Sequence, residues 1–335
     1  MHFDLINMFD IITIGSATLD VFLKCNHLHI NTHLSEESGE SKEMCLPFGK
    51  KIEVDDALFD VGGGGTNAAV TLARQNLNVA VIAKIGKDFA GEKVLRELAN
   101  DKVNTSLLVQ DPESGTDFST ILWAPNFGTT ILVYRGKSRL ETTEIPFDKI
   151  QSKWAYISST EGNLNIIAEI RKLITDIRIA WNPGRKELMQ KEKLLATLPN
   201  VELLILNRSE LTELLGEQQG VDVNSLLSKS TILQCKSLIV TDGHLGSYYF
   251  SKDKWLHASA FQVERVETTG AGDAFGSAFV AGKIKGLNDK ECLKISAANA
   301  ASVVTYVGAK RGILKEEQLQ NWMIKELVVE ELPLV

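Results

Sequence analysis

Residues 267–279 have the sequence ETTGAGDAFGSAF, in which two glycines and one carboxylate lead into small and apolar residues. Glycines at the start of a helix let its backbone approach a ligand closely. The free N–H groups of the first turn, at the positive end of the helix dipole, can hold a phosphate, and Asp273 would stand beside it. This arrangement suits phosphoryl transfer, because amides stabilise the transferring group and a carboxylate accepts the hydroxyl proton. The alternative is that Asp273 only caps the helix.

A second glycine-rich stretch, VGGGGTN at 61–67, precedes a predicted helix over 68–75. Four consecutive glycines weaken helices and strands, so they indicate positive φ angles or a ligand close to the backbone. Gly63 and Gly65 also fit a loose dinucleotide-binding fingerprint. The next predicted strand, however, ends near Lys84, where that fingerprint needs an acidic residue for the ribose. A dinucleotide-dependent dehydrogenase is therefore the less favoured alternative.

Strands and helices alternate along most of the chain. Short apolar runs, such as FDIITIG at 9–15 and LLIL at 203–206, are typical of buried parallel strands, and helical stretches separate them. The pattern predicts an α/β fold, a doubly wound and mostly parallel sheet with helices on both faces. Because no Pro- or Gly-rich linker divides residues 1–335, we expect a single domain.

Two β-rich interruptions, at about 21–59 and 117–135, do not fit this alternation. We expect them to pair as a small β-sheet that forms a lid and closes over the substrate. Within the first, the polar stretch 26–50 is expected to be a variable loop, and the second is expected to be a hairpin that turns at 125–128. The outer edge of such a lid could pair two subunits into a homodimer.

Polar residues follow several predicted strands: Asp20, Asn182, NRSE at 207–210 and TDGHLG at 241–246. The carboxyl ends of parallel strands meet at one edge of a sheet, so these residues indicate one ligand site. Asn207 and Glu210 suit a magnesium ion held through water, although Glu210 is also explained as an ordinary capping-box residue. Residues 241–246 fit either a backbone loop around a nucleotide or a tight turn.

Composition and charge argue against several classes of protein. The net charge of −7 and the lack of a basic run do not favour a nucleic-acid partner. No apolar run reaches the ~20 residues needed to cross a membrane. Residues 1–10 lack the apolar core of a signal peptide, and either Met1 or Met8 could be the start. The 4 scattered cysteines are typical of reduced thiols in a cytoplasmic protein, without a disulfide or metal site.

In their order along the chain, the motifs resemble those of the ribokinase-like (PfkB-type) family of sugar and nucleoside kinases, over residues 9–327. The matching motifs are Asp20, GGGGTN at 62–67, Asn207-x-x-Glu210, Thr241-x-Gly243-x-x-Gly246 and TGAGD at 269–273. The resemblance implies ATP-dependent phosphorylation of a hydroxymethyl group on a sugar or nucleoside, with Mg²⁺ as cofactor.

The same resemblance implies roles for individual residues. The general base would be Asp273, and the anion hole would consist of the amides of Gly270, Ala271 and Gly272. Substrate would be bound by Asp20, Gly63, Gly64 and Asn67. Magnesium and the phosphates would be organised by Asn207 and Glu210. The nucleotide site would include Thr241, Gly243, Gly246 and Asn299.

Three positions depart from the family pattern. Glu267 stands where the family usually has aspartate, next to the loop with which many members bind K⁺, so activation by K⁺ is possible but not implied. Gly64 replaces a lysine, and Thr18 an asparagine, that are common in ribokinases proper. Ribose is therefore not the obvious acceptor.

The acceptor segments 18–20 and 62–67 favour a sugar over a nucleoside. They offer carboxylate, hydroxyl, amide and backbone groups, which match a polyhydroxylated ligand, whereas a nucleobase needs a flat apolar slot. An adenosine-type nucleoside kinase remains the alternative, because the expected lid carries the aromatic residues Phe22, Trp123 and Phe127. A catalytically weak binding or regulatory protein is less favoured, because the catalytic and magnesium motifs are intact.

Overall fold

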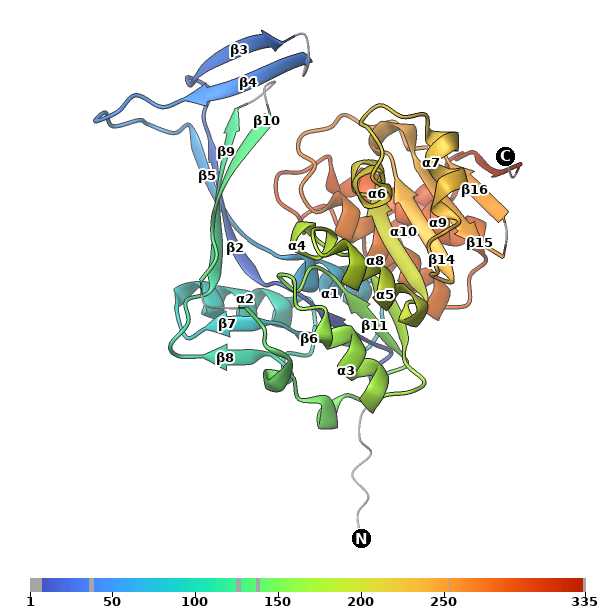
Figure 1. Cartoon of the computed structure of the whole chain (residues 1–335). Helices are drawn as coiled ribbons and strands as arrows, with labels where there is room; N and C mark the ends of the chain where they lie inside the picture. Colours follow the sequence, from blue (N-terminus) through green and yellow to red (C-terminus); the bar gives the residue numbers. More distant parts are fainter. Residues whose placement is uncertain (1–7, 36–38, 125–127, 137–138, 253, 334–335) are drawn as a thin grey trace.

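The computed structural model describes residues 8–35, 39–124, 128–136, 139–252 and 254–333. Within them a nine-stranded sheet has the order β17-β16-β15-β14-β13-β12-β11-β1-β6 (Figure 1). The strands from β6 to β14 are parallel, and β15 to β17 continue the sheet antiparallel. In sheet order from β6 they are β6 (Val79–Ile82), β1 (Ile11–Ile14), β11 (Trp154–Ile157), β12 (Arg178–Trp181), β13 (Leu203–Asn207), β14 (Ser237–Thr241), β15 (Ser247–Ser251), β16 (Lys254–Ala258) and β17 (Val329–Leu332).

Helices cover both faces of this sheet, because successive residues of a strand point to opposite sides. Ile12 and Ile14 belong to the hydrophobic cluster that includes residues of α3 to α7, whereas Ile11 belongs to the cluster that includes residues of α1, α2, α8 and α9. The predicted fold class, a doubly wound and mostly parallel α/β sheet, is confirmed. The helices are α1 (Gly64–Arg74), α2 (Phe89–Asn100), α3 (Asn165–Leu173), α4 (Arg185–Leu188), α5 (Lys191–Thr197), α6 (Arg208–Leu215), α7 (Val223–Ser230), α8 (Ala271–Ile284), α9 (Asp289–Val303) and α10 (Glu316–Met323).

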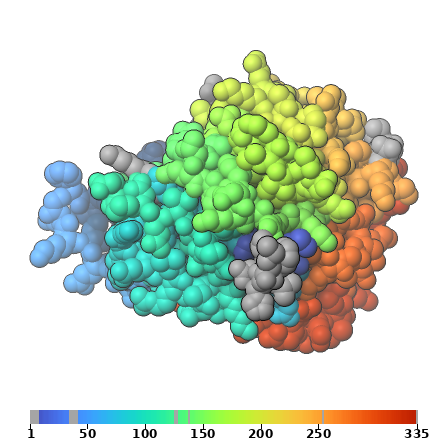
Figure 2. All heavy atoms as spheres, turned by 90° about the horizontal axis from the view of Figure 1, so that it is seen from below, coloured from blue at the N-terminus to red at the C-terminus, as the bar shows by residue number. Residues whose placement is uncertain are grey.

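A second sheet of four strands, in the order β10-β9-β2-β5, unites the two interruptions of the sequence. Its strands are β2 (Thr18–Lys24), β5 (Asp56–Gly62), β9 (Asp117–Ala124) and β10 (Gly128–Tyr134). The sheet stands away from the helices of the main body (Figure 1), and residues near its tip protrude in light blue in Figure 2. The expected hairpin turn includes residues 125–127, which lie outside the described part of the chain.

The stretch 26–50, expected to be a loop, instead contains an antiparallel hairpin of β3 (His29–Ser35) and β4 (Gly39–Cys45). Cross-strand side chains support the pairing: Asn31 Nδ2 lies 3.2 Å from Cys45 Sγ, and His33 Nε2 lies 3.2 Å from Glu43 Oε2. The hairpin escaped prediction because most residues of its strands are polar and the few apolar ones do not form a sustained alternation.

Other boundaries also differ from expectation. The strand expected over 79–85 is divided into β6 and β7 (Lys84–Gly86), and β7 pairs with β8 (Val109–Asp111) in a separate sheet. The chain was expected to end in helices, but β17 follows α10 and pairs with β16. Among the described residues, no helix has the length and apolar character required to cross a membrane.

Candidate active site

The first turns of α1 and α8 meet beside the C-terminal ends of β1 and β11. Asn67 in α1 donates from Nδ2 to Asp273 Oδ2 in α8 at 2.9 Å, although 206 positions separate the two residues. Each helix follows a glycine with positive φ, Gly63 at 94° and Gly270 at 80°. At both glycines a Cβ would collide with a neighbouring segment. The two glycine-rich motifs of the sequence thus belong to one site.

Gly64 lies close to both the Asp273 carboxylate and Ser158, where a larger side chain would collide. A Cβ at Gly64 would stand 3.2 Å from Asp273 Oδ1 and 2.7 Å from Ser158 Oγ. Asp273 is partly buried, and burial raises the pKa of its carboxyl, whereas the Asn67 hydrogen bond and the charge of Lys310 oppose the rise. A raised pKa makes a carboxylate a better proton acceptor.

Glu267 shapes the turn that precedes α8. Its Oε1 accepts from the Thr269 N–H at 2.8 Å and from Thr269 Oγ1 at 2.6 Å. Ala271 N donates to Thr268 O at 3.2 Å, so one amide of the expected anion hole already has a partner. Gly272 is exposed, and beyond its own turn no atom of the described residues lies within 4 Å of its would-be Cβ. The open part of this segment is therefore Gly272.

Two carboxylates are buried where the second sheet meets the main body. Asp20 in β2 lies directly opposite Asp60 in β5, and they are 7% and 6% exposed. Asp20 was expected just beyond a strand of the main sheet; it lies inside β2, because the chain enters the second sheet at Thr18. Burial raises the pKa of Asp20 to about 6, although Lys310 opposes the rise. Burial also raises the pKa of Asp60, a residue that the sequence analysis missed.

Lys310 is a buried cation of the same region, 3% exposed. Its Nζ donates to Val61 O at 2.5 Å, to Thr66 Oγ1 at 2.9 Å and to Asn67 Oδ1 at 2.7 Å. Burial lowers the pKa of Lys310 to about 8, against the attraction of nearby carboxylates. No sequence signal pointed to this lysine, because it comes from the loop after α9 and belongs to none of the motifs.

Asn207 and Glu210 form a reciprocal capping box at the start of α6. Glu210 N donates to Asn207 Oδ1 at 2.9 Å, and Asn207 N donates to Glu210 Oε2 at 2.8 Å. Burial raises the pKa of the Glu210 carboxyl, and the negative charge of Asp273 raises it further. The structure therefore bears out the capping explanation and also places Glu210 within electrostatic range of Asp273. This carboxylate and amide suit a magnesium ion.

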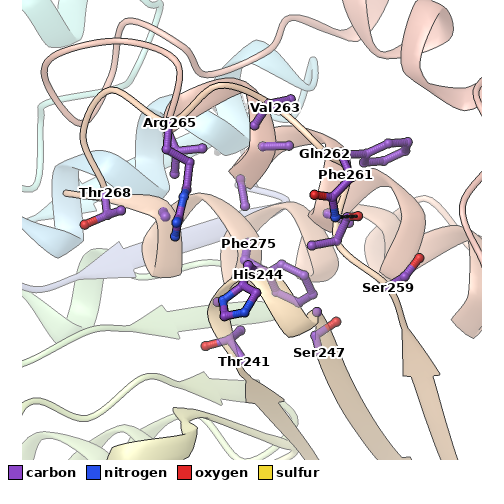
Figure 3. A pocket seen from close by; sticks show the side chains of 18 of the residues that line it. Thr241, His244, Ser247, Ser259, Phe261, Gln262, Val263, Arg265, Thr268 and Phe275 are labelled. Carbon is purple, nitrogen blue, oxygen red and sulfur yellow. Dashed lines mark hydrogen bonds between the residues drawn. The ribbon is translucent and has the colours of Figure 1, made fainter. Parts of the chain in front are cut away.

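A cavity of about 430 Å³ adjoins the start of α8. Figure 3 shows His244 and Arg265 pointing toward it, with the ring of Phe275 close by. The predicted nucleotide residues Thr241, Gly243 and Gly246 line the cavity, and so do Ala271 and Gly272. At Gly246, with φ of 104°, a Cβ would stand 2.0 Å from Ala258 O, so only glycine fits this turn.

Asn299, predicted to contact the nucleotide, does not line this cavity. It is fully buried; its Nδ2 donates to Ala274 O at 2.9 Å, and its Oδ1 accepts from Leu314 N at 2.9 Å. Both polar ends of the side chain therefore join backbone segments. The cavity is lined instead by the neighbouring alanines of α9, Ala297, Ala300 and Ala301.

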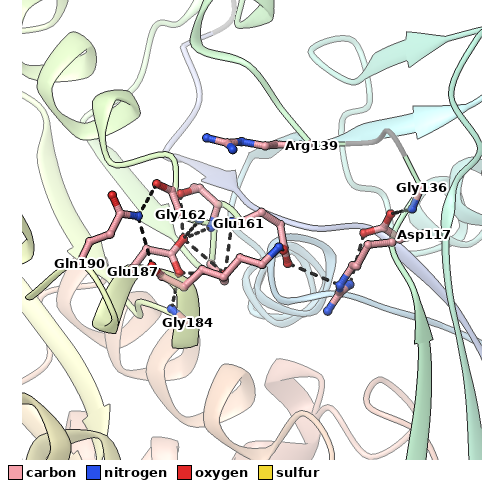
Figure 4. Close-up of polar contacts among 12 residues, drawn as sticks. Asp117, Gly136, Arg139, Glu161, Gly162, Gly184, Glu187 and Gln190 are labelled. Carbon is pink, nitrogen blue, oxygen red and sulfur yellow. Dashed lines mark hydrogen bonds and ion pairs between the residues drawn. The ribbon is translucent and has the colours of Figure 1, made fainter.

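A polar network joins the second sheet to the loop after β11 (Figure 4). Arg135, which follows β10, lies 3.3 Å from Asp117 Oδ2 and 3.5 Å from Glu161 Oε1. Glu161 also pairs with Lys186 at 2.6 Å. The buried Glu187 carboxylate accepts backbone N–H groups of the same loop, among them that of residue 160 at 2.6 Å. The sequence analysis missed this network, because its members come from four separate segments.

A model of the pfkB family carbohydrate kinases matches residues 29–316. The chain belongs to this family. It is accordingly a kinase, an ATP-dependent phosphotransferase with an alcohol group as acceptor. The resemblance inferred from the motifs is confirmed.

Curated relatives include sugar kinases and a nucleoside kinase. Ribokinase of Staphylococcus aureus (strain COL) is 29% identical over 266 residues, which cover 77% of this chain and 86% of the relative. The nucleoside kinase of Methanocaldococcus jannaschii is 25% identical over 266 residues, which cover 78% of this chain and 85% of the relative.

Solved structures of the family share the fold. Thermotoga maritima ribokinase superposes with a TM-score of 0.77 at 20% identity, over 95% of this chain and 100% of the other. The structure of the M. jannaschii nucleoside kinase gives 0.75 at 22% identity, over 95% of this chain and 99% of the other. The fold therefore does not distinguish a sugar from a nucleoside as acceptor.

Asp20→Asn is expected to raise the free energy of unfolding at pH 7 by about 1–3 kcal/mol and to leave it unchanged near pH 3.5. The Asp20 pKa is about 6 in the folded protein against an ordinary 3.8, so the folded state binds more protons between these values. Wild-type stability therefore falls as the pH rises through this window, a loss that asparagine avoids. Urea denaturation at both pH values measures the difference. Asp176→Asn, at an exposed site, is the control, and an equal effect of Asp20→Asn at both pH values would contradict the expectation.

Proposed function

We propose that the protein transfers the γ-phosphate of ATP to a hydroxymethyl group of a sugar, with Asp273 as general base. The supporting observation is the position of Asp273 between the cavity and the glycine-rich start of α1. Its helical turn lines the 430 Å³ cavity through Ala271 and Gly272, and its carboxylate lies against Asn67 and close to Gly64. Phosphate donor and acceptor hydroxyl would meet at this one turn.

Each group at the junction has a chemical task in this proposal. The acceptor hydroxyl, placed beside Gly64, gives its proton to Asp273 as its oxygen attacks the phosphorus. The N–H groups at the start of α8, open at Gly272, hold the transferring phosphoryl group. Further hydroxyls of the sugar would bind Asp20 and Asn67, with Gly63 allowing close approach of the backbone.

We place Mg²⁺ at Asn207 and Glu210, held through water. When bound, the ion neutralises charge on the phosphates. Glu210 is suited to this because its carboxylate interacts electrostatically with that of Asp273, and two negative charges close together favour a cation. Among the described residues no cluster of three acidic, histidine or cysteine side chains could hold a metal, so water and phosphate would complete the coordination.

We also propose that a monovalent cation such as K⁺ binds next to Glu267. This side chain is 6% exposed, and its Oε2 has no hydrogen-bond partner among the described residues. A buried carboxylate oxygen is costly unless it is paired, and a cation would pair it. Turnover in potassium chloride against choline chloride tests this role.

A sugar fits the acceptor side better than a nucleoside. Of the three aromatic candidates, Phe22 is only 2% exposed. Lys24 Nζ lies 5.5 Å from the ring centroid of Trp123, so a face of that ring is already occupied. Phe127 lies outside the described residues. The groups that remain along the glycine-rich stretch are hydrogen-bonding groups: Asp20 beside Gly62, and Ser158 and Asp273 beside Gly64.

We propose that the second sheet is a lid that closes over the acceptor. Protection of β9 and β10 from hydrogen exchange at saturating substrate would test this.

The edge strand β10 of the second sheet is exposed along its whole length, and Ile131, Leu132 and Val133 are each about half exposed. An apolar, unpaired edge favours pairing with a second copy of the chain. We therefore propose a homodimer through this sheet, which light scattering at several protein concentrations tests.

Asp273→Asn is expected to lower kcat by about 10²-fold or more, because loss of a general base typically costs 10²–10⁴-fold. Nucleotide binding should persist, because the cavity is lined by the backbone and by other side chains. The measurements are steady-state turnover and calorimetric binding of ATP. The exposed Asp176→Asn serves as control, and near-normal turnover of Asp273→Asn would remove this residue from the mechanism.

Among hexoses, pentoses, inositol and the common nucleosides, a sugar is expected to give the highest kcat/KM. The reason is that polar groups near Gly64 match several hydroxyls, and each buried group left unpaired costs about 1–3 kcal/mol. Consumption of ATP measures the whole panel. A nucleoside that exceeds every sugar tenfold would reject the sugar assignment and leave the kinase assignment intact.

A further inference from the structure

The amino group of Lys310 is buried, yet its hydrogen bonds within the described chain all go to uncharged oxygens. The three acceptors are Val61 O, Thr66 Oγ1 and Asn67 Oδ1. An ammonium has three protons, so these bonds use its full donor capacity. Burying a charge against neutral partners is costly, and such arrangements are most often found at functional sites.

Lys310 determines which way the Asn67 amide points. An ammonium can only donate, so the side-chain oxygen of Asn67 must face Lys310 at 2.7 Å. The NH₂ group then points away and donates to Asp273 Oδ2 at 2.9 Å. A flipped amide would place two donors against each other at Lys310 and would leave Asp273 facing an oxygen. The orientation is thus fixed by chemistry.

The backbone of the loop that carries Lys310 is anchored by Arg74. Arg74 Nη1 donates to Lys310 O at 2.8 Å and to Ile313 O at 2.9 Å, and Arg74 is itself paired with Asp101 at 2.7 Å. Before Lys310 the loop passes through Gly308, with φ of 97°, where a Cβ would stand 2.2 Å from Asp60 Oδ2. The loop after α9 is therefore anchored on the far end of α1 and packed against β5.

We propose that Lys310 is a positioning residue for phosphoryl transfer: through Asn67 it holds the Asp273 carboxylate in the orientation in which it accepts the acceptor's proton. Lys310 does not line the 430 Å³ cavity, and it is not among the atoms nearest to Gly64. The inference rests on the proposed role of Asp273 as general base.

The charge of Lys310 strengthens this arrangement. A cation on the oxygen side of an amide polarises it, so the N–H of Asn67 becomes a stronger donor to Asp273. Bound in this way, one oxygen of Asp273 is fixed, and the other, Oδ1, lies nearest to Gly64. The charged groups around Lys310 are Asp20 from β2, Asp60 from β5, Asp273 from α8 and Glu97 from α2, all of them acidic. Lys310 offsets their mutual repulsion, together with Arg135, which acts on Asp20, and Arg311, which acts on Asp60.

Lys310→Met, which keeps the length of the side chain, tests the proposal. We expect kcat to fall about 10–100-fold, since small misplacements of catalytic groups have effects of this size. The KM for ATP should change less than about twofold, because Lys310 does not line the cavity. A ¹³C titration of labelled aspartate carboxyls, with Asp273 assigned through Asp273→Asn, should show its midpoint at higher pH in the variant. Because the charge of Lys310 also acts on Asp273 directly, the same shift is measured in an Asn67→Ala background, where only the direct effect of the charge is left; an equally large shift there would contradict a route through Asn67. Lys290→Met, at an exposed lysine of α9, is the matched control.

A double-mutant cycle with Asn67→Ala tests whether Lys310 influences Asp273 through Asn67. If Lys310 acts through Asn67, Lys310→Met lowers kcat no further once Asn67 is alanine. Multiplied effects, or a lone Lys310→Met with unchanged kcat and Asp273 midpoint, would overturn the inference. If Lys310→Met does not fold, Lys310→Met with Asp60→Asn removes one charge of each sign and is measured instead. If neither folds, Lys310 serves the fold itself and the proposal is rejected.

The two proposals fail in different ways. If Asp273→Asn keeps its turnover, the general-base assignment is wrong. If Asp273→Asn loses turnover and Lys310→Met keeps it, only the role of Lys310 is wrong.

Discussion

The hydrogen bond between Asn67 and Asp273 joins two helix N-termini that would otherwise repel each other. Each N-terminus carries roughly half a positive charge, so bringing two of them together is unfavourable without a negative group. The carboxylate of Asp273 is that group, and it lies within the field of Glu210 at the start of a third helix, α6. The converging N-termini thus supply positive potential that partly offsets the two carboxylates, and their N–H groups would stabilise an incoming phosphate.

Such close convergence is possible only because the chain lacks side chains where the segments cross. A Cβ at Gly65 would stand 2.9 Å from backbone atoms of Gly15, and one at Gly62 would stand 1.9 Å from Asp20 Oδ2. Gly62 faces the second sheet, Gly63 and Gly65 face the segment that follows β1, and Gly64 faces Ser158 and Asp273. This explains why four glycines follow one another, in spite of the entropy that they lose on folding.

Prediction from sequence succeeded for features that a few neighbouring residues reveal through their apolar pattern or their glycines. The parallel sheet, the two glycine motifs and the turn at Gly246 were all predictable, because apolar runs and glycines are visible locally. The hairpin of β3 and β4 was not, because no residue whose burial is described in it is buried. Lys310 and Asn299 show a second limit of prediction from sequence. Each binds residues far away in the chain, and its neighbours in the sequence do not reveal whether its partners are a ligand or other parts of the protein.

The proposed donor and acceptor sides of the site are lined by different kinds of groups, and this difference has a consequence for specificity. The 430 Å³ cavity, the proposed nucleotide site, is made of backbone turns, alanines and a few aromatic rings, which tolerate change as long as glycine remains at positions such as Gly246. The proposed acceptor side instead carries ionisable groups, Asp20, Asp60 and Lys310, each about 93% or more buried. The pKa of each of these groups depends on the charge of the others, so replacing one changes the protonation of the rest. Acceptor specificity should therefore change only through several coupled substitutions, whereas the donor side can stay as it is.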